Sequence, residues 1–477
     1  METPASASPD SLAELAANAR RDLERLNFPP APWVPPVDGP DGGPMLDALV
    51  VGGGMCGQAA LFALLREGIG NVRCVDREPR GLEGPWATYA RMETLRSPKH
   101  LTGPDLGVPS LTYRAWHEAK YGAAHWAALH KIPRLDWARY LLWVRDTVGL
   151  KIDNDTEVTA IEPEAGGVRA TIGGRPVYAR KVVLALGREG SGDLRWPDFE
   201  TFNPDRRGAR VFHSADDIDF AALRGKRVGV LGAGSSAFDN AGSALEAGAA
   251  SVTMFARRPY LPQVNKSKWT AFPGFQHGYA ALDDARRWRF YAYIFSEQVP
   301  PPYESVLRCE RHAGFELRFA EGWRDIEEKE DVVVTTARGR HAFDAVVVCT
   351  GFDVNLVERP EIATFRDAIE TWRAHVPAAE AERFPEEARF PYLGDAFQLR
   401  GSAPGLDRVH VFNWGATLSH GALGGDIPGV EVGARRLAQG IARDLFLEDV
   451  ERHWRRLRAQ NEDEMKPTRY FVPLDRR

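Results

Sequence analysis

The sequence predicts an α/β fold, because one succession of elements occurs twice along its 477 residues. In each copy a short aliphatic run meets a glycine-rich turn, a helix-forming segment follows, and a second short aliphatic run closes the unit. The two copies occupy residues 45–76 and 227–258. Units of this kind build parallel sheets covered by helices, and the length suggests about three domains, or two with one split.

The first copy starts with a predicted buried strand over 46–51 and a turn with the spacing G-x-G-x-x-G. The glycines of this motif are Gly52, Gly54 and Gly57. The first makes a tight turn, the second lets the backbone approach a pyrophosphate, and the third lets the next helix pack closely on the strand. The helix predicted over 58–66 offers free N–H groups and a partial positive charge to that pyrophosphate. A strand over 72–75 ends at Asp76, where an acid would hydrogen-bond a ribose hydroxyl. The first copy therefore predicts a dinucleotide site.

The second copy repeats this order with a G-x-G-x-x-A motif. Its motif residues are Gly232, Gly234 and Ala237. They lie between strands predicted over 228–231 and 251–255, and no acid follows the second of these strands. Arg257 and Arg258 stand there instead, and an arginine at this place accommodates a 2′-phosphate. We therefore expect NADPH rather than NADH at the second site.

Helices and meanders flank the two copies. Residues 1–44 form an extension with a helix predicted over 11–26, Ser11 as its N-cap, and a stretch rich in proline and glycine after it. Further predicted elements are an amphipathic helix over 135–148, a meander of four short strands over 157–186, a second meander over 331–350 and a helix over 430–447. Residues 259–311 are aromatic-rich and predicted to be irregular. Because they follow the second motif directly, we expect them to help form the substrate or nicotinamide region.

Composition excludes several classes of protein. The net charge of −5 gives no basis for nucleic-acid binding, and no apolar run approaches the roughly 20 residues of a membrane span. The four cysteines form no C-x-x-C motif, so we expect neither a metal site nor a dithiol redox centre. The first residues do not look like a secretory signal, and with reduced thiols we expect a cytoplasmic protein.

Two such motifs in this order resemble the two-dinucleotide-binding-domain flavoproteins. More narrowly, the chain looks like the class B flavoprotein monooxygenases, which include the flavin-containing, the Baeyer–Villiger and the N-hydroxylating monooxygenases. The resemblance covers roughly residues 45–447. It implies that the first motif binds FAD and the second NADPH, on two Rossmann-like domains with the NADPH domain inserted into the FAD domain and β-meander crossovers between them. The implied division is 1–44 for the extension, 45–190 for the first part of the FAD domain, 191–343 for the NADPH domain, and 344–477 for the rest of the FAD domain and a C-terminal helix.

The resemblance also implies further site residues. Gly84-Pro85-Trp86 is similar to the family's Gly-Gly-x-Trp stretch near the flavin, which assigns Trp86 to the cofactor. Residues 95–99 are similar to the segment that brings polar side chains over the isoalloxazine. The catalytic candidates on that segment are Arg96, Ser97 and Lys99. Thr350-Gly351-Phe352 looks like a second strand end at the cofactor, and residues 419–421 are similar to the closing flavin segment of the N-hydroxylating branch. The cofactor candidates from these two places are Gly351, His420 and Gly421.

One departure lowers two of the subclasses. The flavin-containing and Baeyer–Villiger fingerprint is F-x-G-x-x-x-H-x-x-x-W or Y. His213 is present, but Arg207, Ala209 and Asp217 replace the phenylalanine, the glycine and the aromatic residue. This pattern favours a relative closer to the N-hydroxylating branch.

The resemblance implies a monooxygenase. NADPH would reduce FAD, reduced flavin and O₂ would form a C4a-(hydro)peroxyflavin, and one oxygen would pass to nitrogen or sulfur of a small molecule. The alternatives are Baeyer–Villiger oxidation of a ketone, an FAD-dependent NADPH oxidoreductase without oxygen transfer, and a nucleotide-binding protein without catalysis. The sequence leaves the substrate open. A homo-oligomer is compatible with it, but the oligomeric state is open as well.

Overall fold

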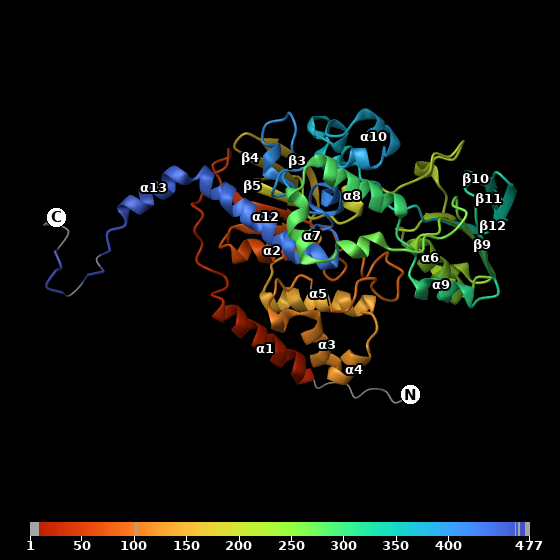
Figure 1. Cartoon of the computed structure of the whole chain (residues 1–477), viewed down its shortest axis with the longest axis horizontal. Coiled ribbons are helices and arrows are strands. Elements are labelled where there is room, and N and C mark those ends of the chain that lie inside the picture. Colours follow the sequence, from red (N-terminus) through yellow and green to blue (C-terminus); the bar gives the residue numbers. More distant parts are fainter. Residues whose placement is uncertain (1–8, 101–102, 463, 466–467, 473–477) are drawn as a thin grey trace.

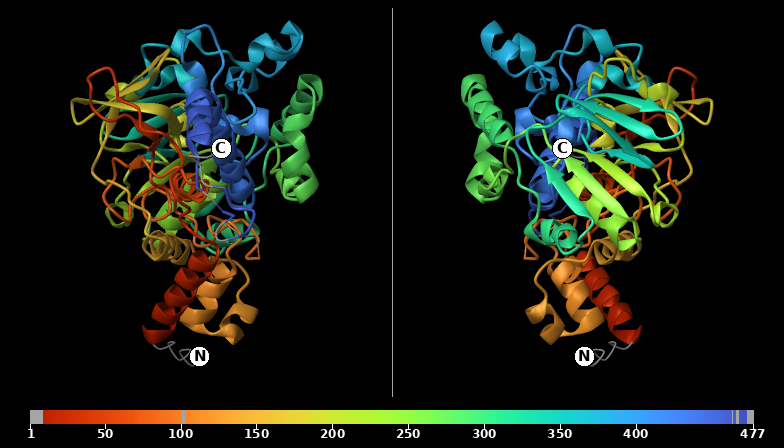
Figure 2. Two further views of the ribbon diagram at one scale, coloured as in Figure 1. Left: turned by 90° about the vertical axis from the view of Figure 1, so that its left-hand side faces the viewer. Right: turned by 90° about the vertical axis from the view of Figure 1, so that its right-hand side faces the viewer.

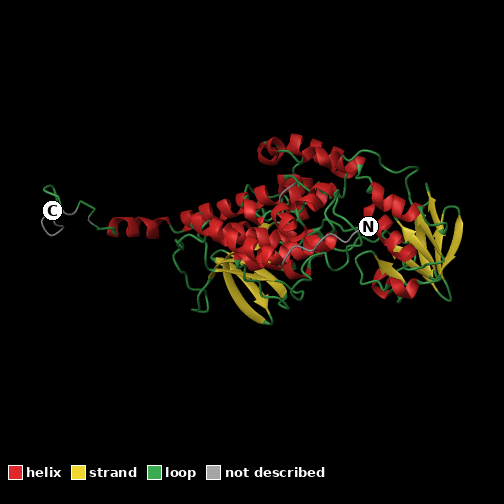
Figure 3. Cartoon of the chain, turned by 90° about the horizontal axis from the view of Figure 1, so that it is seen from below, coloured by secondary structure: helices red, strands yellow, loops and turns green. Residues whose placement is uncertain are grey.

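The computed structural model describes residues 9–100, 103–462, 464–465 and 468–472. Its strands form two main sheets in two separate α/β bodies, with a long C-terminal segment extending from one of them (Figure 3). The first body lies in the middle of the molecule and the second at the end opposite the C-terminus (Figure 1). The predicted α/β architecture with two parallel units is confirmed.

The first sheet has the strand order β2-β1-β5-β4-β3, with β14 added beside β5. Its strands are β1 (Leu46–Val51), β2 (Val72–Val75), β3 (Val158–Glu164), β4 (Gly167–Ile172), β5 (Arg175–Leu184) and β14 (Val409–Val411). Strand β1 pairs in parallel with β2 and with β5, and β14 pairs in parallel with β5. The two strands predicted around the first motif have the predicted bounds. Strand β14 was not predicted from the sequence.

The four-strand meander predicted over 157–186 is wrong in one respect, because its last two strands are one continuous strand, β5. The first half of β5 pairs antiparallel with β4 and the second half parallel with β1. The charged residues Arg180 and Lys181 interrupt the apolar pattern in its middle, yet both are buried. Lys181 Nζ lies 2.9 Å from Glu448 and Arg180 Nη1 lies 2.6 Å from Asp449. Partners from the far end of the chain therefore allow two charges inside a buried strand.

The second sheet has the order β6-β13-β7-β8-β9, and all its pairings are parallel. Its strands are β6 (Val211–His213), β7 (Arg227–Leu231), β8 (Ser251–Phe255), β9 (Phe315–Arg318) and β13 (Ala345–Val348). The antiparallel strands β10 (Trp323–Glu328), β11 (Val332–Thr336) and β12 (Gly339–Phe343) form a third, small sheet. Because β13 lies between β6 and β7, the second domain continues past the predicted boundary at 343 to about residue 348. The boundary prediction is corrected by these pairings.

Helices cover both sheets. In the first body they are α2 (Met55–Arg66), α3 (Tyr113–Tyr121), α4 (Ala123–Ala128), α5 (Arg134–Val148), α11 (Thr417–His420) and α12 (Ile427–Glu448). Helix α1 (Pro9–Arg25) packs on α3 and α5, and these helices project from one side of the molecule (Figure 2). The predicted N-cap is wrong: α1 begins before Ser11, whose Oγ instead donates a hydrogen bond to the carbonyl oxygen of Ala119 at 2.6 Å.

The aromatic-rich segment 259–311 is largely helical, which corrects the expectation of an irregular segment. Its helices are α7 (Pro273–Gly278), α8 (Asp284–Glu297) and α9 (Tyr303–Glu310). Helix α8 has a side-chain N-cap, because Asp283 accepts a hydrogen bond from the backbone N–H of Arg286 at 2.8 Å. Helix α6 (Ser235–Glu246) follows the second glycine motif and packs on α9.

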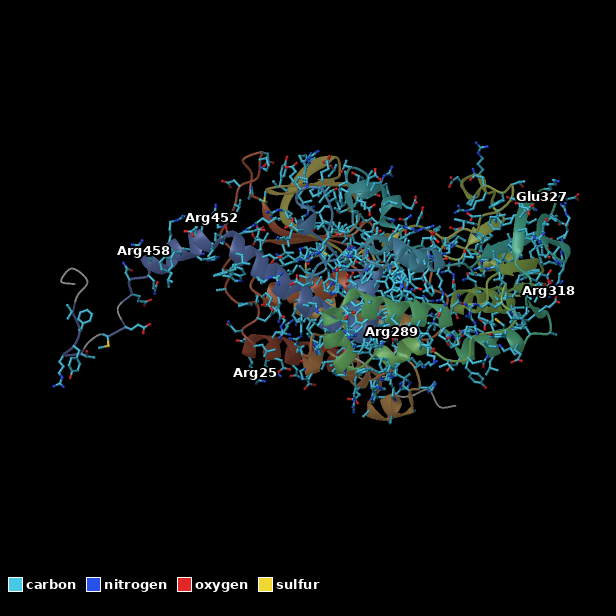
Figure 4. All side chains as sticks on the ribbon, turned by 45° about the horizontal axis from the view of Figure 1, so that its top comes forward. Arg25, Arg289, Arg318, Glu327, Arg452 and Arg458 are labelled. Carbon is cyan, nitrogen blue, oxygen red and sulfur yellow. The ribbon has the colours of Figure 1, made fainter. Side chains whose placement is uncertain are left out.

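Several helices, among them α3, α4 and α11, were not predicted, and neither were two further ones. The two further ones are α10 (Ala378–Arg383) and α13 (Val450–Ala459). Helix α13 carries Arg452 and Arg458 and extends away from the body (Figure 4). None of the helices in the described part of the chain has the length and apolar character needed to cross a membrane. All four cysteines are buried and have free thiols.

Candidate functional site

One large cavity, of about 1630 Å³, is lined by residues from both bodies. It is larger than the roughly 300–1,000 Å³ of an ordinary small-molecule pocket, so it has room for more than one ligand. The predicted site residues in its lining are Gly52, Gly54, Asp76, Trp86, Arg96, Ser97, Gly234, Gly351 and Gly421. Segments from α7, α8 and the beginning of α12 complete the wall.

The glycine motif at the beginning of α2 has the shape that a dinucleotide needs. Gly52 has a φ of +100°, and a Cβ atom there would lie 2.6 Å from the carbonyl oxygen of Ala185. A Cβ at Gly57 would lie 1.8 Å from the carbonyl oxygen of Gly52, so this glycine sets how closely helix and turn pack. At Gly54, by contrast, a Cβ would meet no atom nearer than 3.8 Å, and the residue faces the cavity. The open side of Gly54 and the N-terminus of α2 therefore fit the pyrophosphate of FAD.

Asp76 braces this turn from the end of β2. Its Oδ2 accepts a hydrogen bond from the N–H of Gly53 at 2.6 Å, and its Oδ1 accepts one from the N–H of Glu78 at 2.8 Å. Desolvation raises the pKa of this carboxyl, and the two backbone hydrogen bonds partly offset that effect. Asp76 also lines the cavity, so its predicted hydrogen bond to a ribose is sterically open and stays a prediction.

The second motif has the same construction. Gly232 has a φ of +117°, and a Cβ there would lie 2.7 Å from the carbonyl oxygen of Cys349, the residue that follows the neighbouring strand β13. Gly234 has open space on the cavity side, and Ala237 is fully buried between α6 and the sheet. Ser235 and Ser236, at the N-terminus of α6, line the cavity. This end of the cavity fits a second dinucleotide.

Arg257 and Arg258 follow β8, where the sequence places them, but outside the cavity lining that the structure describes. Arg257 is exposed, and its side chain lies against Gly322, where a Cβ would come within 2.6 Å of the Arg257 Cγ. Their predicted contact with a 2′-phosphate stays a prediction.

Two other candidates have side chains outside the cavity. Lys99 Nζ donates a hydrogen bond to the carbonyl oxygen of Trp126 at 2.6 Å and lies 4.7 Å from the centre of its ring. His420 is buried, stacks on Phe397 at 3.9 Å, and has its Nε2 2.8 Å from the carbonyl oxygen of Gly394. Burial lowers the pKa of His420 to about 3, so the imidazole is neutral. In this structure both side chains hold neighbouring segments together.

Four charged side chains, the charged quartet, meet in the cavity wall. They are Arg96, Arg188, Asp239 and Asp426. Arg96 Nη2 lies 3.8 Å from Asp239 Oδ2, and Arg188 Nη2 lies 3.8 Å from Asp426 Oδ1. Asp239 belongs to α6 of the second body, whereas Asp426 directly precedes α12 of the first. The charged quartet therefore lies between the two glycine motifs, where the reactive rings of two dinucleotides have to meet for hydride transfer.

Sequence reasoning found only Arg96 of this quartet. Arg188 follows strand β5 by a few residues, and Asp426 is the residue just before a helix. Both positions lie at the carboxyl ends of parallel strands or at a helix N-terminus, where ligands bind in open α/β sheets. Applying this rule to the sequence would have identified Arg188 and Asp426 as candidate site residues.

An aromatic wall lies beside the quartet. The guanidinium carbon of Arg188 is 3.7 Å from the centre of the Trp414 ring. Phe295 lies 6.3 Å from Trp414, ring centre to ring centre, and both rings line the cavity together with the amide of Gln298. This part of the cavity combines flat apolar surfaces with hydrogen-bonding groups, which suits a planar polar ligand.

Two family models match the chain. One, for FAD-NAD(P)-binding proteins, matches residues 49–189, and the other, for L-lysine 6-monooxygenase/L-ornithine 5-monooxygenase, matches residues 123–291. A FAD-dependent urate hydroxylase from Xanthomonas campestris pv. campestris is 42% identical over 447 residues, which are 92% of this chain and 94% of that protein.

Solved structures show the same fold at low sequence identity. An ornithine N-hydroxylase from Kutzneria sp. 744 has a TM-score of 0.66 at 16% identity, over 84% of this chain and 100% of that one. L-lysine 6-monooxygenase from Pseudomonas syringae has a TM-score of 0.59 at 18% identity, over 84% and 99%. At these identities the likeness concerns the fold.

Proposed function

Because this chain belongs to the class B flavoprotein monooxygenases, an enzyme family that uses FAD and NADPH, we propose that it hydroxylates urate or a closely related oxidised purine. The observation that carries this proposal is the 42% identity to a urate hydroxylase over nearly the whole of both chains. The planar wall of Trp414 and Phe295, beside two arginines, supports it, since urate is flat and anionic at neutral pH.

The residues present fit both cofactors. The turn around Gly54 would hold the pyrophosphate of FAD, and the turn around Gly234 that of NADPH. When bound, the flavin accepts a hydride from NADPH, activates O₂ and supplies the oxygen atom that enters the substrate. The overall reaction consumes substrate, O₂, NADPH and one proton, and it yields hydroxylated substrate, NADP⁺ and water.

The chain's own groups bind and orient the reactants. Arg96 and Ser97 line the cavity from the loop of the first body, and Arg96 faces Asp239 across the two bodies. A guanidinium there stabilises negative charge as it develops during oxygen transfer. Trp86 packs on Trp137, with ring centres 6.3 Å apart, and lines this side of the cavity.

N-hydroxylation of an amino acid amine is the second candidate. The match to the lysine and ornithine monooxygenase model favours it, and so do the carboxylates Asp239 and Asp426, which suit an ammonium group. S-oxygenation, Baeyer–Villiger oxidation and NADPH oxidation without oxygen transfer are the remaining alternatives. Location in the cytoplasm stays a prediction from the reduced thiols.

A substrate panel separates these candidates. The FAD-loaded enzyme is given NADPH and air with urate, L-ornithine, L-lysine, a thioether or a ketone, and NADPH use, product and H₂O₂ are measured. We expect urate to accelerate NADPH oxidation and to be converted one for one. Conversion of ornithine or lysine with urate unchanged would contradict the purine proposal and support the amine.

A further inference from the structure

Five arginines line the cavity, and they differ in whether other protein groups accept hydrogen bonds from their guanidinium groups. They are Arg77, Arg91, Arg96, Arg188 and Arg359. Arg77 bonds to Glu189 at 2.6 Å, Arg91 to the carbonyl oxygen of Thr88 at 2.6 Å, and Arg359 to Glu361 at 2.9 Å. These three guanidinium groups have protein acceptors at hydrogen-bond distance.

Arg96 and Arg188 are different. Over the described residues their guanidinium groups have a carboxylate at 3.8 Å, which is beyond hydrogen-bond length, and no closer acceptor. A guanidinium carries five N–H donors in a rigid planar fork, and it stays charged in proteins. Donors that the protein does not satisfy, in the wall of a ligand cavity, are available to a ligand with acceptor atoms.

Trp414 supports the guanidinium group of Arg188. With the guanidinium carbon 3.7 Å from the ring centre, the side chain lies on the indole face, held by cation–π attraction. Trp414 is itself held, because its ring packs on Gly425, where a Cβ would come within 3.0 Å of the indole. The indole thus covers the Arg188 guanidinium from one side, while over the described residues its N–H donors have no protein acceptor at hydrogen-bond distance.

Burial acts differently on the two carboxylates and the two arginines of the quartet. Desolvation raises the pKa of Asp239 and of Asp426, and the arginines only partly offset this effect. The carboxylates therefore lose their charge more readily than exposed ones, whereas the arginines stay protonated. An anion that binds to the two guanidinium groups therefore meets less opposing negative charge here than it would beside exposed carboxylates.

We propose that Arg188, held against Trp414, binds the anionic acceptor edge of the substrate, an oxidised purine such as urate, with Arg96 facing the same space from the loop of the first body. This inference rests on the proposed function and names the group that recognises its substrate. The planar fork and the planar anion form two parallel hydrogen bonds, as Arg does with carboxylates.

The test uses the FAD-loaded enzyme with NADP⁺ present, and urate is titrated while the flavin absorption spectrum is followed. The variants are Arg188→Gln, Arg188→Lys and Trp414→Phe, and the matched control is Arg289→Gln, which changes an exposed arginine of α8 (Figure 4). Steady-state KM values for urate and for NADPH are measured on the same preparations. Flavin content per chain shows whether each variant is folded.

Loss of a charged, bidentate contact should weaken urate binding about 10- to 100-fold in Arg188→Gln. Arg188→Lys should recover part of this loss, Trp414→Phe should cost a few-fold, and Arg289→Gln should bind like the wild type. The KM for NADPH should change by less than about 2-fold. Xanthine is a purine of similar shape but lower acidity. The change from wild type to Arg188→Gln should therefore weaken the binding of xanthine less than the binding of urate.

The outcomes separate this inference from the proposed function. If the wild type neither binds nor converts urate, the proposed function is wrong. If the wild type binds urate and Arg188→Gln binds it equally well, only the role of Arg188 is wrong. A rise in the KM for NADPH as large as that for urate would mean that Arg188 holds the nicotinamide cofactor, which also overturns the inference.

Discussion

Cys56 donates a hydrogen bond from its Sγ to the backbone carbonyl oxygen of Gly424, 3.1 Å away and 368 residues later in the chain. This contact joins the first glycine motif to the turn that begins α12. Desolvation raises the pKa of the Cys56 thiol to about 12, so it stays protonated and donates. The FAD end of the cavity is therefore complete only when both ends of the chain have come together.

Substituting valine for Gly54 or for Gly234 should affect the binding of only one cofactor in each case. Gly54 and Gly234 each have room for a side chain on the cavity side, so Gly54→Val and Gly234→Val should fold. Gly54→Val should give colourless protein, because the valine occupies the place of the FAD pyrophosphate. Gly234→Val should stay yellow but need far more NADPH for half-maximal flavin reduction. Normal flavin content in Gly54→Val would contradict the first assignment.

Removing Arg257 and Arg258 together tests the choice of NADPH. Loss of their charge should raise the KM for NADPH about 10-fold or more and leave the KM for NADH nearly unchanged, because NADH lacks the 2′-phosphate. Steady-state flavin reduction with each nucleotide gives both values. An equal change in the two KM values would contradict a contact between these arginines and the 2′-phosphate.

Arg96 and Lys99 should behave differently although only two residues lie between them in the sequence. Arg96 lines the cavity, whereas Lys99 is bound to the carbonyl oxygen of Trp126. Arg96→Gln should lower the share of NADPH that ends in product and raise H₂O₂ release, because developing negative charge loses its stabilising partner. Lys99→Gln should change thermal stability more than coupling. If both variants lost the same share of product per NADPH, Lys99 would have a catalytic role like that of Arg96.

Acid should unfold the first body partly through Glu448. Desolvation raises its pKa, but the charges and hydrogen bonds of Lys181 and Arg180 outweigh this and lower it from 4.5 to about 2. The pKa of Glu448 is lower in the folded protein than in the unfolded chain. The contacts of Glu448 with Lys181 and Arg180 therefore stabilise the fold fully above about pH 4.5, and this contribution is lost as the pH falls toward 2.

Urea unfolding at several pH values checks this prediction. At pH 7, Glu448→Gln should lower the free energy of unfolding by about 2–3 kcal/mol, because it leaves Lys181 buried without its partner. The control Glu118→Gln, in an exposed pair with Arg114 on α3, should cost less than about 0.5 kcal/mol. The difference between wild type and Glu448→Gln should shrink at pH 3.

Local patterns predicted the dinucleotide units because those units are local. The strands at 46–51 and 72–75 are apolar runs bounded by glycines and an acid, and both were predicted to the residue. Strand β5 was divided in two because Arg180 and Lys181 interrupt its pattern, and their partners Glu448 and Asp449 are far away in sequence. A local pattern cannot include such a partner.

The sequence predicts only those parts of the site that come from a single continuous segment. Ser97 faces the cavity and Lys99 does not, yet a loop has no period that would distinguish them. The charged quartet comes from four segments between residues 96 and 426, and only the packing of the two bodies brings them together. His420 follows the family motif, but a hydrogen bond to Gly394 directs its ring into the core.

Isotope labelling tests the central claim most directly. The FAD-loaded enzyme is mixed with NADPH and urate under ¹⁸O₂, and the product is examined by mass spectrometry while NADPH and H₂O₂ are quantified. A hydroxylated purine with one ¹⁸O atom, formed at one product per NADPH, is the predicted result. NADPH oxidation that yields stoichiometric H₂O₂ and unlabelled, unchanged urate would contradict the assignment of urate as substrate.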